Sequence, residues 1–295
     1  MRYEGNIFRP GLTESNSYLL QVTMGCMHNK CSFCSFYKDK PFKLRPYKEI
    51  EEDILMDRKQ IGHVPSVFLI DGNVAGMSME RLRPILKKIK EVFPESKYTN
   101  MYGTYSDVYR KSIDDLKEMK ELGVDCIYAF IESGSDKVLN DIHKGVSYDE
   151  AVTGANKLSE AGIGFFANMI LGMGGTKDSE VHVNESIRFM NEVKAPFVAT
   201  TALNPQPGTE LYNKILDKTF ELPTYRQILE EEERYIKGIN PDLSFNLMSG
   251  AFLPLNDLII GNLPEDRNRI LEELEMRKSK YKHWLDKKIK LGGSL

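Results

Sequence analysis

Six short runs of β-branched and other apolar residues recur along the chain, and each is followed by a charged segment with helical periodicity. The runs are YLLQVTMG, SVFLIDG, YTNMYGTY, CIYAFIES, FFANMILGM and FVATTALNP. They follow one another at about 30 to 50 residues, the length of a strand, a crossover and a helix, so the strands should be parallel. The repeat predicts an α/β fold with a barrel-like sheet. Polar or glycine-rich loops follow each strand, where such folds bind ligands.

The pattern changes after Pro207 to helices and loops, among them TELYNKILDK and the acidic LEEEERYIKG. We therefore divide the chain into a lead-in of residues 1–17, a barrel of residues 18–207 and a helical C-terminal extension of residues 208–295. The extension is the natural lid, and we expect it to cover the mouth of the barrel. Its candidate pocket residues are Phe245, Met248 and Phe252, and packing in the core is the alternative role for each.

Charge and composition restrict the partners of this chain. Its 295 residues carry a formal net charge of -3, which argues against a protein held to nucleic acid or anionic lipid by bulk positive charge. A small molecule is therefore the expected substrate. No apolar run approaches the roughly 20 residues that a membrane-spanning helix needs, and no signal sequence opens the chain. We expect no membrane partner and a cytoplasmic location.

Three of the four cysteines lie close together, at Cys26, Cys31 and Cys34, with the spacing C-x4-C-x2-C. Such crowding is a poor disulfide framework and indicates metal ligands. A structural zinc site needs four ligands, and His28 between the first two cysteines has awkward reach. Ordinary 4Fe-4S clusters also take four cysteines, but Cys126 lies on the fourth strand run. A cluster held by three cysteines leaves one iron open to a substrate or cofactor.

The stretch GCMHNKCSFCSFY resembles the radical S-adenosylmethionine (radical SAM) superfamily, whose three-cysteine loop after the first barrel strand holds such a cluster. The usual spacing is C-x3-C-x2-C, so this loop has one extra residue. The resemblance implies a partial (β/α)6 TIM-like barrel, a 4Fe-4S cluster on Cys26, Cys31 and Cys34, and S-adenosylmethionine at the open iron. Phe33 matches the aromatic residue that the family places near the adenine.

The turn DGN follows the second strand run, where the family has a glycine-glycine-glutamate-like turn. The resemblance implies that Asp71, Gly72 and Asn73 hold the methionine amino group of the cofactor. Asp-Gly-Asn is also an ordinary turn sequence, so this motif is weak by itself.

The segment IESGSDKVLNDIHKG is similar to the fourth-strand region of methylthiotransferases and of oxygen-independent coproporphyrinogen oxidase. By that resemblance Glu132 and Ser133 face the cofactor, and Lys144 offers a cation to the methionine carboxylate. The alternatives are an exposed helix lysine for Lys144 and a helix N-cap for Ser133 and Ser135.

The fifth and sixth strand runs complete the resemblance, which extends from Gln21 to about Gly208. It implies that Asn168 points toward the ribose, that Gly172 and Met173 pass close to the adenine, and that Asn204 lies at the adenine edge. The rival interpretation of LGMGG, a phosphate loop, lacks the Lys-Ser/Thr ending of a P-loop.

The implied chemistry is reductive cleavage of S-adenosylmethionine to methionine and a 5'-deoxyadenosyl radical, which abstracts a substrate hydrogen. The resemblance also implies that the reaction takes place under anaerobic conditions, with an electron donor such as flavodoxin or ferredoxin. No cysteine follows Cys126, so we expect a single cluster. The likeness is to stand-alone members of the branch that includes the Elongator subunit, the methylthiotransferases and nitrogenase-cofactor assembly. It names no reaction, and oxidoreductase, lyase and transferase activities all remain open.

Two other functions fit the same cysteines. An iron-sulfur redox or iron sensor would not turn over S-adenosylmethionine and would tolerate the loss of Asp71, Lys144 or Asn168. A zinc-stabilised interaction protein would bind its metal through the three cysteines and His28.

Overall fold

The protein was analysed as a computed structural model, which describes residues 2–5, 7–11, 14–240, 243, 245–250 and 258–291. In residues 245–250 it describes only the backbone and the Leu247 side chain. Phe252 and the side chains of Phe245 and Met248 therefore lie outside the described part. The chain forms two compact units. Unit 1 comprises residues 1–29, 36–129 and 153–165, and unit 2 comprises residues 30–35, 130–152 and 166–295.

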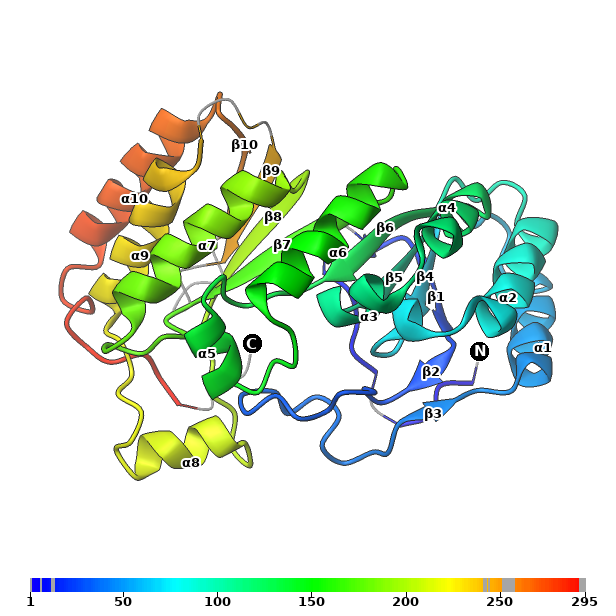
Figure 1. Ribbon diagram of the computed structural model, residues 1–295, viewed down its shortest axis with the longest axis horizontal. Helices are drawn as coiled ribbons and strands as arrows, with labels where there is room; N and C mark the ends of the chain where they lie inside the picture. Colours follow the sequence, from blue (N-terminus) through cyan, green and yellow to red (C-terminus); the bar gives the residue numbers. More distant parts are fainter. Residues whose placement is uncertain are drawn as a thin grey trace. The chain divides into compact units, whose positions relative to one another are not determined.

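Four parallel strands form the sheet of unit 1, and they correspond to the first four predicted runs (Figure 1). In sheet order they are β1 (Tyr18–Gln21), β4 (Val67–Ile70), β5 (Thr99–Gly103) and β6 (Val124–Ala129). All residues of β1 and β4 are buried, so these strands read as continuous apolar runs, as is typical of parallel strands covered on both faces.

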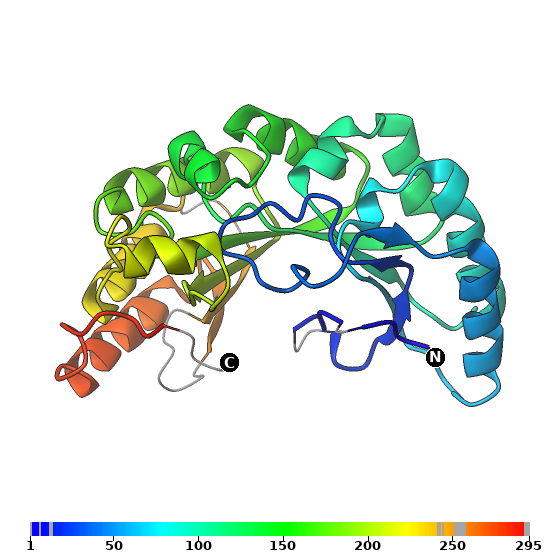
Figure 2. The same cartoon turned by 90° about the horizontal axis from the view of Figure 1, so that it is seen from below.

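Helices cover one face of these strands, as Figures 1 and 2 show for α1, α2 and α4. The helices of unit 1 are α1 (Tyr47–Arg58), α2 (Met79–Val92), α3 (Tyr105–Arg110) and α4 (Ile113–Glu121), with a 3-10 turn at Val74–Gly76. A small antiparallel pair, β2 (Thr23–Met24) and β3 (Lys43–Leu44), flanks the cysteine loop in sequence. Thr104 and Asp107 form a capping box that begins α3, directly after β5.

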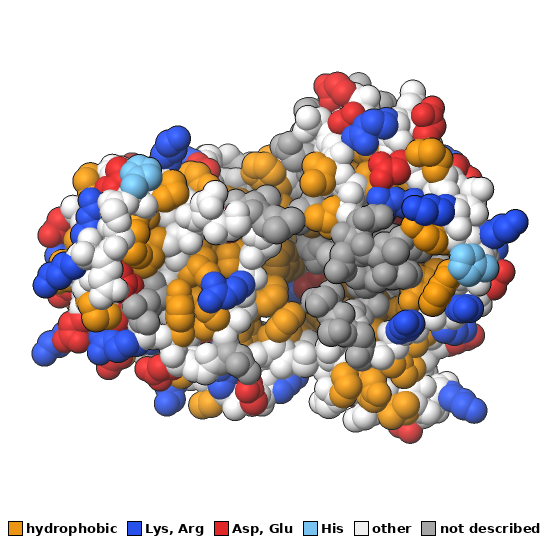
Figure 3. Space-filling model, turned by 180° about the vertical axis from the view of Figure 1, so that it is seen from behind, with side chains coloured by type: hydrophobic (Ala, Val, Ile, Leu, Met, Phe, Trp, Pro, Cys, Tyr) orange, Lys and Arg blue, Asp and Glu red, His pale blue; other side chains and the backbone are white. Residues whose placement is uncertain are grey.

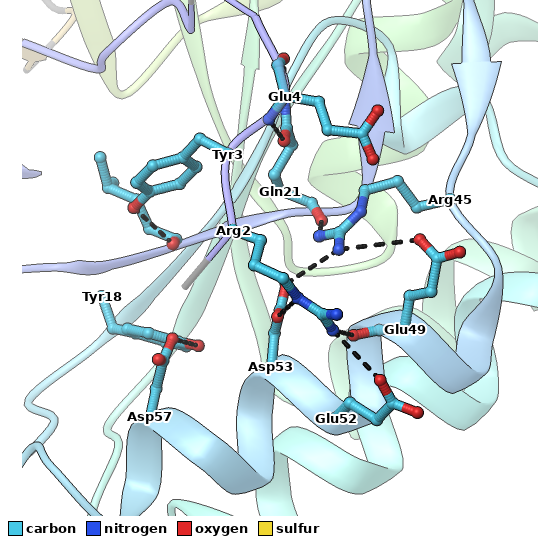
Figure 4. Close-up of polar contacts among 11 residues, drawn as sticks. Arg2, Tyr3, Glu4, Tyr18, Gln21, Arg45, Glu49, Glu52, Asp53 and Asp57 are labelled. Atoms are coloured by element: carbon cyan, nitrogen blue, oxygen red, sulfur yellow. Dashed lines mark hydrogen bonds and ion pairs between the residues drawn. The ribbon is translucent and has the colours of Figure 1, made fainter.

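The N-terminal segment covers the open edge of β1 (Figure 4). The Glu4 N–H donates to Gln21 Oε1 at 2.8 Å, and Gln21 Nε2 donates to the Glu4 carbonyl at 3.2 Å. Arg2 binds the Asp53 carboxylate on α1 at 2.9 Å, and Arg45 binds the other oxygen of that carboxylate at 2.9 Å. Because an uncovered edge strand invites pairing with other chains, this segment protects the sheet of unit 1.

The sheet of unit 2 contains β7 (Gly164–Leu171), β8 (Phe197–Ala202), β9 (Phe245–Gly250) and β10 (Ile259–Leu263). The strands β7, β8 and β9 are parallel, and β10 is antiparallel to β9. The fifth and sixth predicted runs are therefore strands. The strands β9 and β10 were not predicted, because FNLMSG is short and mixed in polarity and takes its backbone partners from the distant β8.

The other helices are α5 (Asp136–Asp141), α6 (Tyr148–Glu160), α7 (Ser179–Val193), α8 (Glu210–Leu216), α9 (Tyr225–Gly238) and α10 (Arg267–Lys280). The helix α9 packs against both α7 and α10. The C-terminal extension thus contains helices, as expected, and in addition a strand pair. The Ser147 and Glu150 pair, a capping-box pattern in the sequence, does make the reciprocal bonds that start α6.

None of the helices in the described part of the chain is long and apolar enough to cross a membrane. On the face of the molecule drawn in Figure 3, acidic and basic side chains are interspersed, and no field of one sign extends over that face. This distribution agrees with the small net charge of the sequence.

Candidate cofactor site

The predicted site residues follow the carboxyl ends of the parallel strands, where α/β folds place their ligand sites. Asp71 directly follows β4, Glu132 lies three residues beyond β6, and Gly172 directly follows β7. Unit 1 contains Cys26, Asp71, Gly72 and Asn73, and unit 2 contains Cys31, Phe33, Cys34, Glu132, Ser133, Lys144, Asn168, Gly172, Met173 and Asn204. Each group is therefore described separately.

In unit 1, Asn73 holds the backbone beside the first cysteine. Its Oδ1 accepts the Met27 N–H at 3.0 Å and lies 2.9 Å from Cys26 Sγ. Its Nδ2 donates to Asp107 at 2.6 Å, and Asp107 is itself fixed by the capping box of α3. Asn73 has a φ of 62°, a left-handed conformation that asparagine tolerates better than most residues. The Asn73 side chain therefore connects the start of α3 to the cysteine loop.

Gly72 allows the turn after β4 to approach Cys26 closely. A Cβ at this position would lie 3.0 Å from the Gly25 carbonyl oxygen and 3.2 Å from both Cα and Cβ of Cys26. The Gly72 carbonyl also accepts the Thr23 hydroxyl at 3.0 Å. Any larger residue would push the turn and the first cysteine apart.

The Asp71 carboxylate, fully buried, binds groups of the chain itself. Lys40 Nζ lies 2.8 Å from Oδ2, with Gln21 Nε2 at 3.2 Å from the same atom. Oδ1 accepts the Phe8 N–H at 3.4 Å and the Tyr37 hydroxyl at 3.5 Å. Lys40 and Tyr37 follow the cysteine loop in sequence, so Asp71 anchors the segment that leaves this loop. This contact was missed by the sequence analysis.

In unit 2, the Glu132 carboxylate bridges Lys144 and Asn168. Lys144 Nζ donates to Oε1 at 2.9 Å, and Asn168 Nδ2 donates to Oε2 at 3.0 Å. All three side chains are buried. The structure thus brings Glu132 and Lys144, from one predicted motif, together with Asn168 from another.

Lys144 is a buried cation beside two of the cysteines. Burial opposes its charge, but the Glu132 carboxylate and the sulfurs of Cys31 and Cys34 outweigh burial, and together they raise the pKa of Lys144. Lys144 lies beyond the end of α5. The alternative of an exposed helix lysine is therefore wrong.

The segment between the second and third cysteines is held by its backbone. The Ser32 N–H donates to the Ile142 carbonyl at 2.9 Å, and the Ser32 carbonyl accepts the Leu211 N–H at 2.9 Å. Phe33, which follows Ser32, is half-buried. The end of α5 and the start of α8 therefore determine where this segment of the loop lies.

Glu132 itself has a φ of 73°, which is uncommon for a residue other than glycine. Its N–H donates to the Asn168 carbonyl at 2.9 Å, and its carbonyl accepts the Ile170 N–H at 3.0 Å. Beside it, Ser133 Oγ lies 2.7 Å from His182 Nδ1. Ser133 is therefore not a helix N-cap; Ser135 occupies that position for α5.

Gly172 faces the C-terminal extension. It has a φ of 82°, and a Cβ here would lie 2.6 Å from Ile228 Cδ1 and 2.8 Å from Pro223 Cγ. Its N–H donates to Glu231 Oε2 on α9 at 2.6 Å. Packing against these residues accounts for the requirement for glycine at this position.

Met173 is buried and contributes to the wall of a cavity of about 360 Å³ in unit 2. Val138, Ile142, Leu211 and Phe220 supply much of the apolar lining of this cavity. Asn204 follows β8 and is half-buried, and its carbonyl accepts Gln206 Nε2 at 3.3 Å.

The donor set fits an iron-sulfur cluster better than a single metal ion. Cys26, Cys31 and Cys34 are half-buried, whereas Cys126 is buried. Within the described ranges, no three His, Cys, Asp or Glu side chains are grouped to hold one metal ion. A zinc site needs its four ligands around one ion, whereas the thiolates of a cluster bind separate irons.

A comparison with protein families decides which family this chain belongs to. The family model described as the radical SAM superfamily matches residues 20–187, more than half of the chain. The chain belongs to the radical SAM superfamily. Its cofactors are accordingly a 4Fe-4S cluster and S-adenosylmethionine.

Two curated relatives belong to archaea. An uncharacterized methyltransferase of Pyrococcus horikoshii is 23% identical over 198 residues, which cover 66% of this chain and 41% of the relative. A putative methylthiotransferase of Methanocaldococcus jannaschii is 22% identical over 240 residues, which cover 78% of this chain and 51% of the relative. This radical SAM chain therefore spans about half the length of the curated relatives that it matches.

The solved structure of methylornithine synthase has a similar fold. The superposition has a TM-score of 0.51 at 15% identity and covers 91% of this chain and 85% of that protein. The expected fold class, an α/β partial (β/α)6 TIM-like barrel, is confirmed by this similarity. All six predicted strand runs are strands in the structure, namely β1, β4, β5, β6, β7 and β8.

The sequence analysis missed several residues that bind the predicted site residues within each unit. They are Lys40, Asp107, His182 and Ser186, none of which belongs to a family motif named above. The only local signal for His182 and Ser186 in the sequence is their spacing of four residues, which places both on the same face of a helix. The structure shows that both are buried.

Proposed function

We propose that this chain is a single-cluster radical SAM enzyme acting on a small-molecule substrate. In this proposal Cys26, Cys31 and Cys34 hold the 4Fe-4S cluster. When bound, the cluster and S-adenosylmethionine supply one-electron cleavage to methionine and a 5'-deoxyadenosyl radical that abstracts a substrate hydrogen. The observation that carries the proposal is the buried Lys144 beside Cys31 and Cys34, held by Glu132.

The Lys144 and Glu132 pair suits a ligand that carries a carboxylate and hydroxyl groups. The methionine carboxylate can bind the Lys144 ammonium. The Glu132 carboxylate can accept a hydrogen bond from one ribose hydroxyl, and the Asn168 amide can donate a hydrogen bond to another. A ligand that satisfies both partners avoids leaving either buried charge alone, which would cost about 3 kcal/mol or more. Ser133, bonded to His182, fixes the backbone next to Glu132.

The remaining assignments use backbone and aromatic groups. We assign Phe33, Gly172, Met173 and Asn204 to the adenine. The turn at Asp71, Gly72 and Asn73 is assigned to the methionine amino group through its backbone. The Asp71 carboxylate is left out of this contact because Lys40 and Gln21 already bind it.

The setting of the reaction is also part of the proposal. The extension of residues 208–295 covers the mouth of the barrel, and flavodoxin or ferredoxin supplies the electron in the cytoplasm. The small net charge favours a small molecule over a nucleic acid as substrate. The putative methylthiotransferase relative supports placement near the methylthiotransferase branch.

The decisive experiment is anaerobic. The protein is reconstituted with iron and sulfide, reduced with dithionite and mixed with S-adenosylmethionine, and 5'-deoxyadenosine is followed by chromatography beside the spin-resonance spectrum of the cluster. We expect 5'-deoxyadenosine and a spectral shift in the wild type. Lys144→Met should keep the cluster and lose the shift, and Cys31→Ala should fold without a cluster.

Two outcomes would contradict the proposal. A cluster that forms without 5'-deoxyadenosine or a spectral shift would favour the redox or iron sensor. Bound zinc with no cluster would favour the zinc-stabilised interaction protein.

A further inference from the structure

Two buried polar side chains on α7 contact the segment that follows Glu132. Ser133 Oγ lies 2.7 Å from His182 Nδ1, and the Gly134 N–H donates to Ser186 Oγ at 2.9 Å. His182 and Ser186 are four residues apart and therefore share one face of the helix. Ser186 Oγ also donates to the His182 carbonyl at 2.7 Å. We call these two residues the α7 clamp.

The tautomer of His182 follows from its partners. His182 Nε2 lies 3.1 Å from the Ile170 carbonyl oxygen, which can only accept, so Nε2 carries the proton. Nδ1 must then accept the Ser133 hydroxyl proton. Burial lowers the pKa of His182 to about 4, against the hydrogen bond to Ile170, so the ring is neutral near pH 7. The Ser133 oxygen in turn accepts the Ser135 N–H at 3.1 Å.

These bonds close a ring around Glu132. The Ile170 N–H donates to the Glu132 carbonyl at 3.0 Å, and the Ile170 carbonyl accepts from His182. His182 returns to Ser133, the neighbour of Glu132. A left-handed backbone at a residue other than glycine persists only where its surroundings determine it. The hydrogen bonds of this ring hold the Glu132 backbone at its φ of 73°.

The packing of Gly134 brings α7 directly against this segment. A Cβ at Gly134 would lie 2.3 Å from the Glu185 carbonyl oxygen and 2.7 Å from Ser186 Cα. The backbone of α7 and the backbone of the segment are therefore in contact, and the helix cannot shift without moving the segment.

We propose that His182 and Ser186 are positioning residues for the Glu132 carboxylate and, through it, for Lys144 and Asn168. Neither residue has to touch the cofactor. The predicted effect of the α7 clamp on S-adenosylmethionine binding rests on the proposed function. Its effect on the position of Glu132 does not, because the hydrogen bonds of the clamp form without the cofactor.

The test compares Ser186→Ala and His182→Phe with Val183→Ala, a buried residue of α7 whose side chain makes no hydrogen bond. Amide hydrogen exchange at Glu132 and Ile170 and the affinity for S-adenosylhomocysteine are measured on the reconstituted protein. Each clamp variant should speed exchange at both amides and raise the Kd about tenfold, because a buried hydrogen bond is lost. Val183→Ala should lower the thermal midpoint and change neither quantity.

Ser186→Ala removes a single hydroxyl, so it decides the question even if His182→Phe does not fold. Exchange and affinity that change no more in Ser186→Ala than in Val183→Ala would overturn the proposal. If the wild type does not bind S-adenosylhomocysteine, the proposed function fails, and the exchange rates alone then decide for or against the clamp.

Discussion

At the scale of single residues, buried carboxylates of unit 2 connect distant segments. Glu231 on α9 accepts the Gly172 N–H at 2.6 Å and the Ser179 hydroxyl. Burial raises the pKa of Glu231 to about 7, against the hydrogen bonds from Ser179 and Gly172. Glu231 therefore connects the extension to the loop after β7, and its burial opposes the ionised form that these two hydrogen bonds favour.

Glu231→Gln should become more stabilising as the pH rises. The unfolded glutamate titrates near 4.5 and the folded one near 7, so the folded state binds more protons between these values and wild-type stability falls with rising pH. Glutamine does not titrate, and the variant should gain up to about 3 kcal/mol over the wild type across this window. Urea unfolding at pH 5 and pH 8 measures the difference in the free energy of unfolding between the variant and the wild type.

The matched control is Glu230→Gln, which removes the same charge from an exposed position of α9. Its stability relative to the wild type should depend much less on pH. An equal gain for Glu231→Gln at both pH values would show that the carboxylate is not protonated in the folded state.

The Lys144 and Glu132 pair makes a second residue-scale prediction. Lys144→Met leaves the Glu132 carboxylate buried without its cation and should lower the free energy of unfolding by about 3 to 5 kcal/mol. Lys144→Met combined with Glu132→Gln removes both charges and should cost less than the sum of the single variants. Urea unfolding of the four proteins without cofactor measures the coupling, and strictly additive effects would contradict it.

At the scale of elements, the turn after β4 and the start of α3 together hold the cysteine loop. Gly72 packs against Cys26, and Asn73 connects Met27 with Asp107. The loop is thus positioned by contacts outside its own sequence.

Asn73→Ala should weaken retention of iron. The variant loses the hydrogen bonds to Met27 and Asp107, so the backbone beside Cys26 is less well held. We expect less iron per chain after reconstitution and gel filtration, in a protein that is still folded. Asn168→Ala is the matched control, since it should retain iron and lose affinity for S-adenosylmethionine. Equal iron content in the two variants would contradict this role of Asn73.

At the scale of the whole molecule, the N-terminal segment contacts β1, the edge strand of its sheet. Glu4 pairs with the Gln21 side chain, and Arg2 and Arg45 share the buried Asp53 carboxylate (Figure 4). The Glu4 contact joins residues 17 positions apart, and the Arg2 contact joins residues 51 positions apart. The integrity of the sheet therefore depends on a segment outside the βα repeat.

Removal of residues 1–5 should make the protein associate. The deletion uncovers the edge of β1, and exposed edges pair between chains. Light scattering and size-exclusion chromatography should show concentration-dependent oligomers. Arg2→Ala is the control, because it removes an exposed arginine and leaves the Glu4 contacts with Gln21 in place, so it should stay in the wild-type oligomeric state. A deletion variant with the wild-type elution volume would contradict this expectation.

The six barrel strands were predictable because a continuous apolar run and the helix that follows it are local patterns. The strands β9 and β10 were not, because β9 takes its hydrogen bonds from β8 more than 40 residues earlier. The resemblance to family motifs allowed us to propose the three cysteines, Glu132, Lys144 and Asn168 as site residues from the sequence. Those motifs could not show that Glu132 would bind both Lys144 and Asn168.

The sequence alone specified the six barrel strands with the helices between them, the three-cysteine loop and the resemblance to the radical SAM family, because each of these depends on short, local spacings. The tertiary structure decided which polar groups meet: Asp71 with Lys40, Asn73 with Asp107, and the α7 clamp with the segment after Glu132. These pairs lie 31 to 52 residues apart. A buried polar group must find a partner, but only the packing of strands and helices determines which partner is within reach.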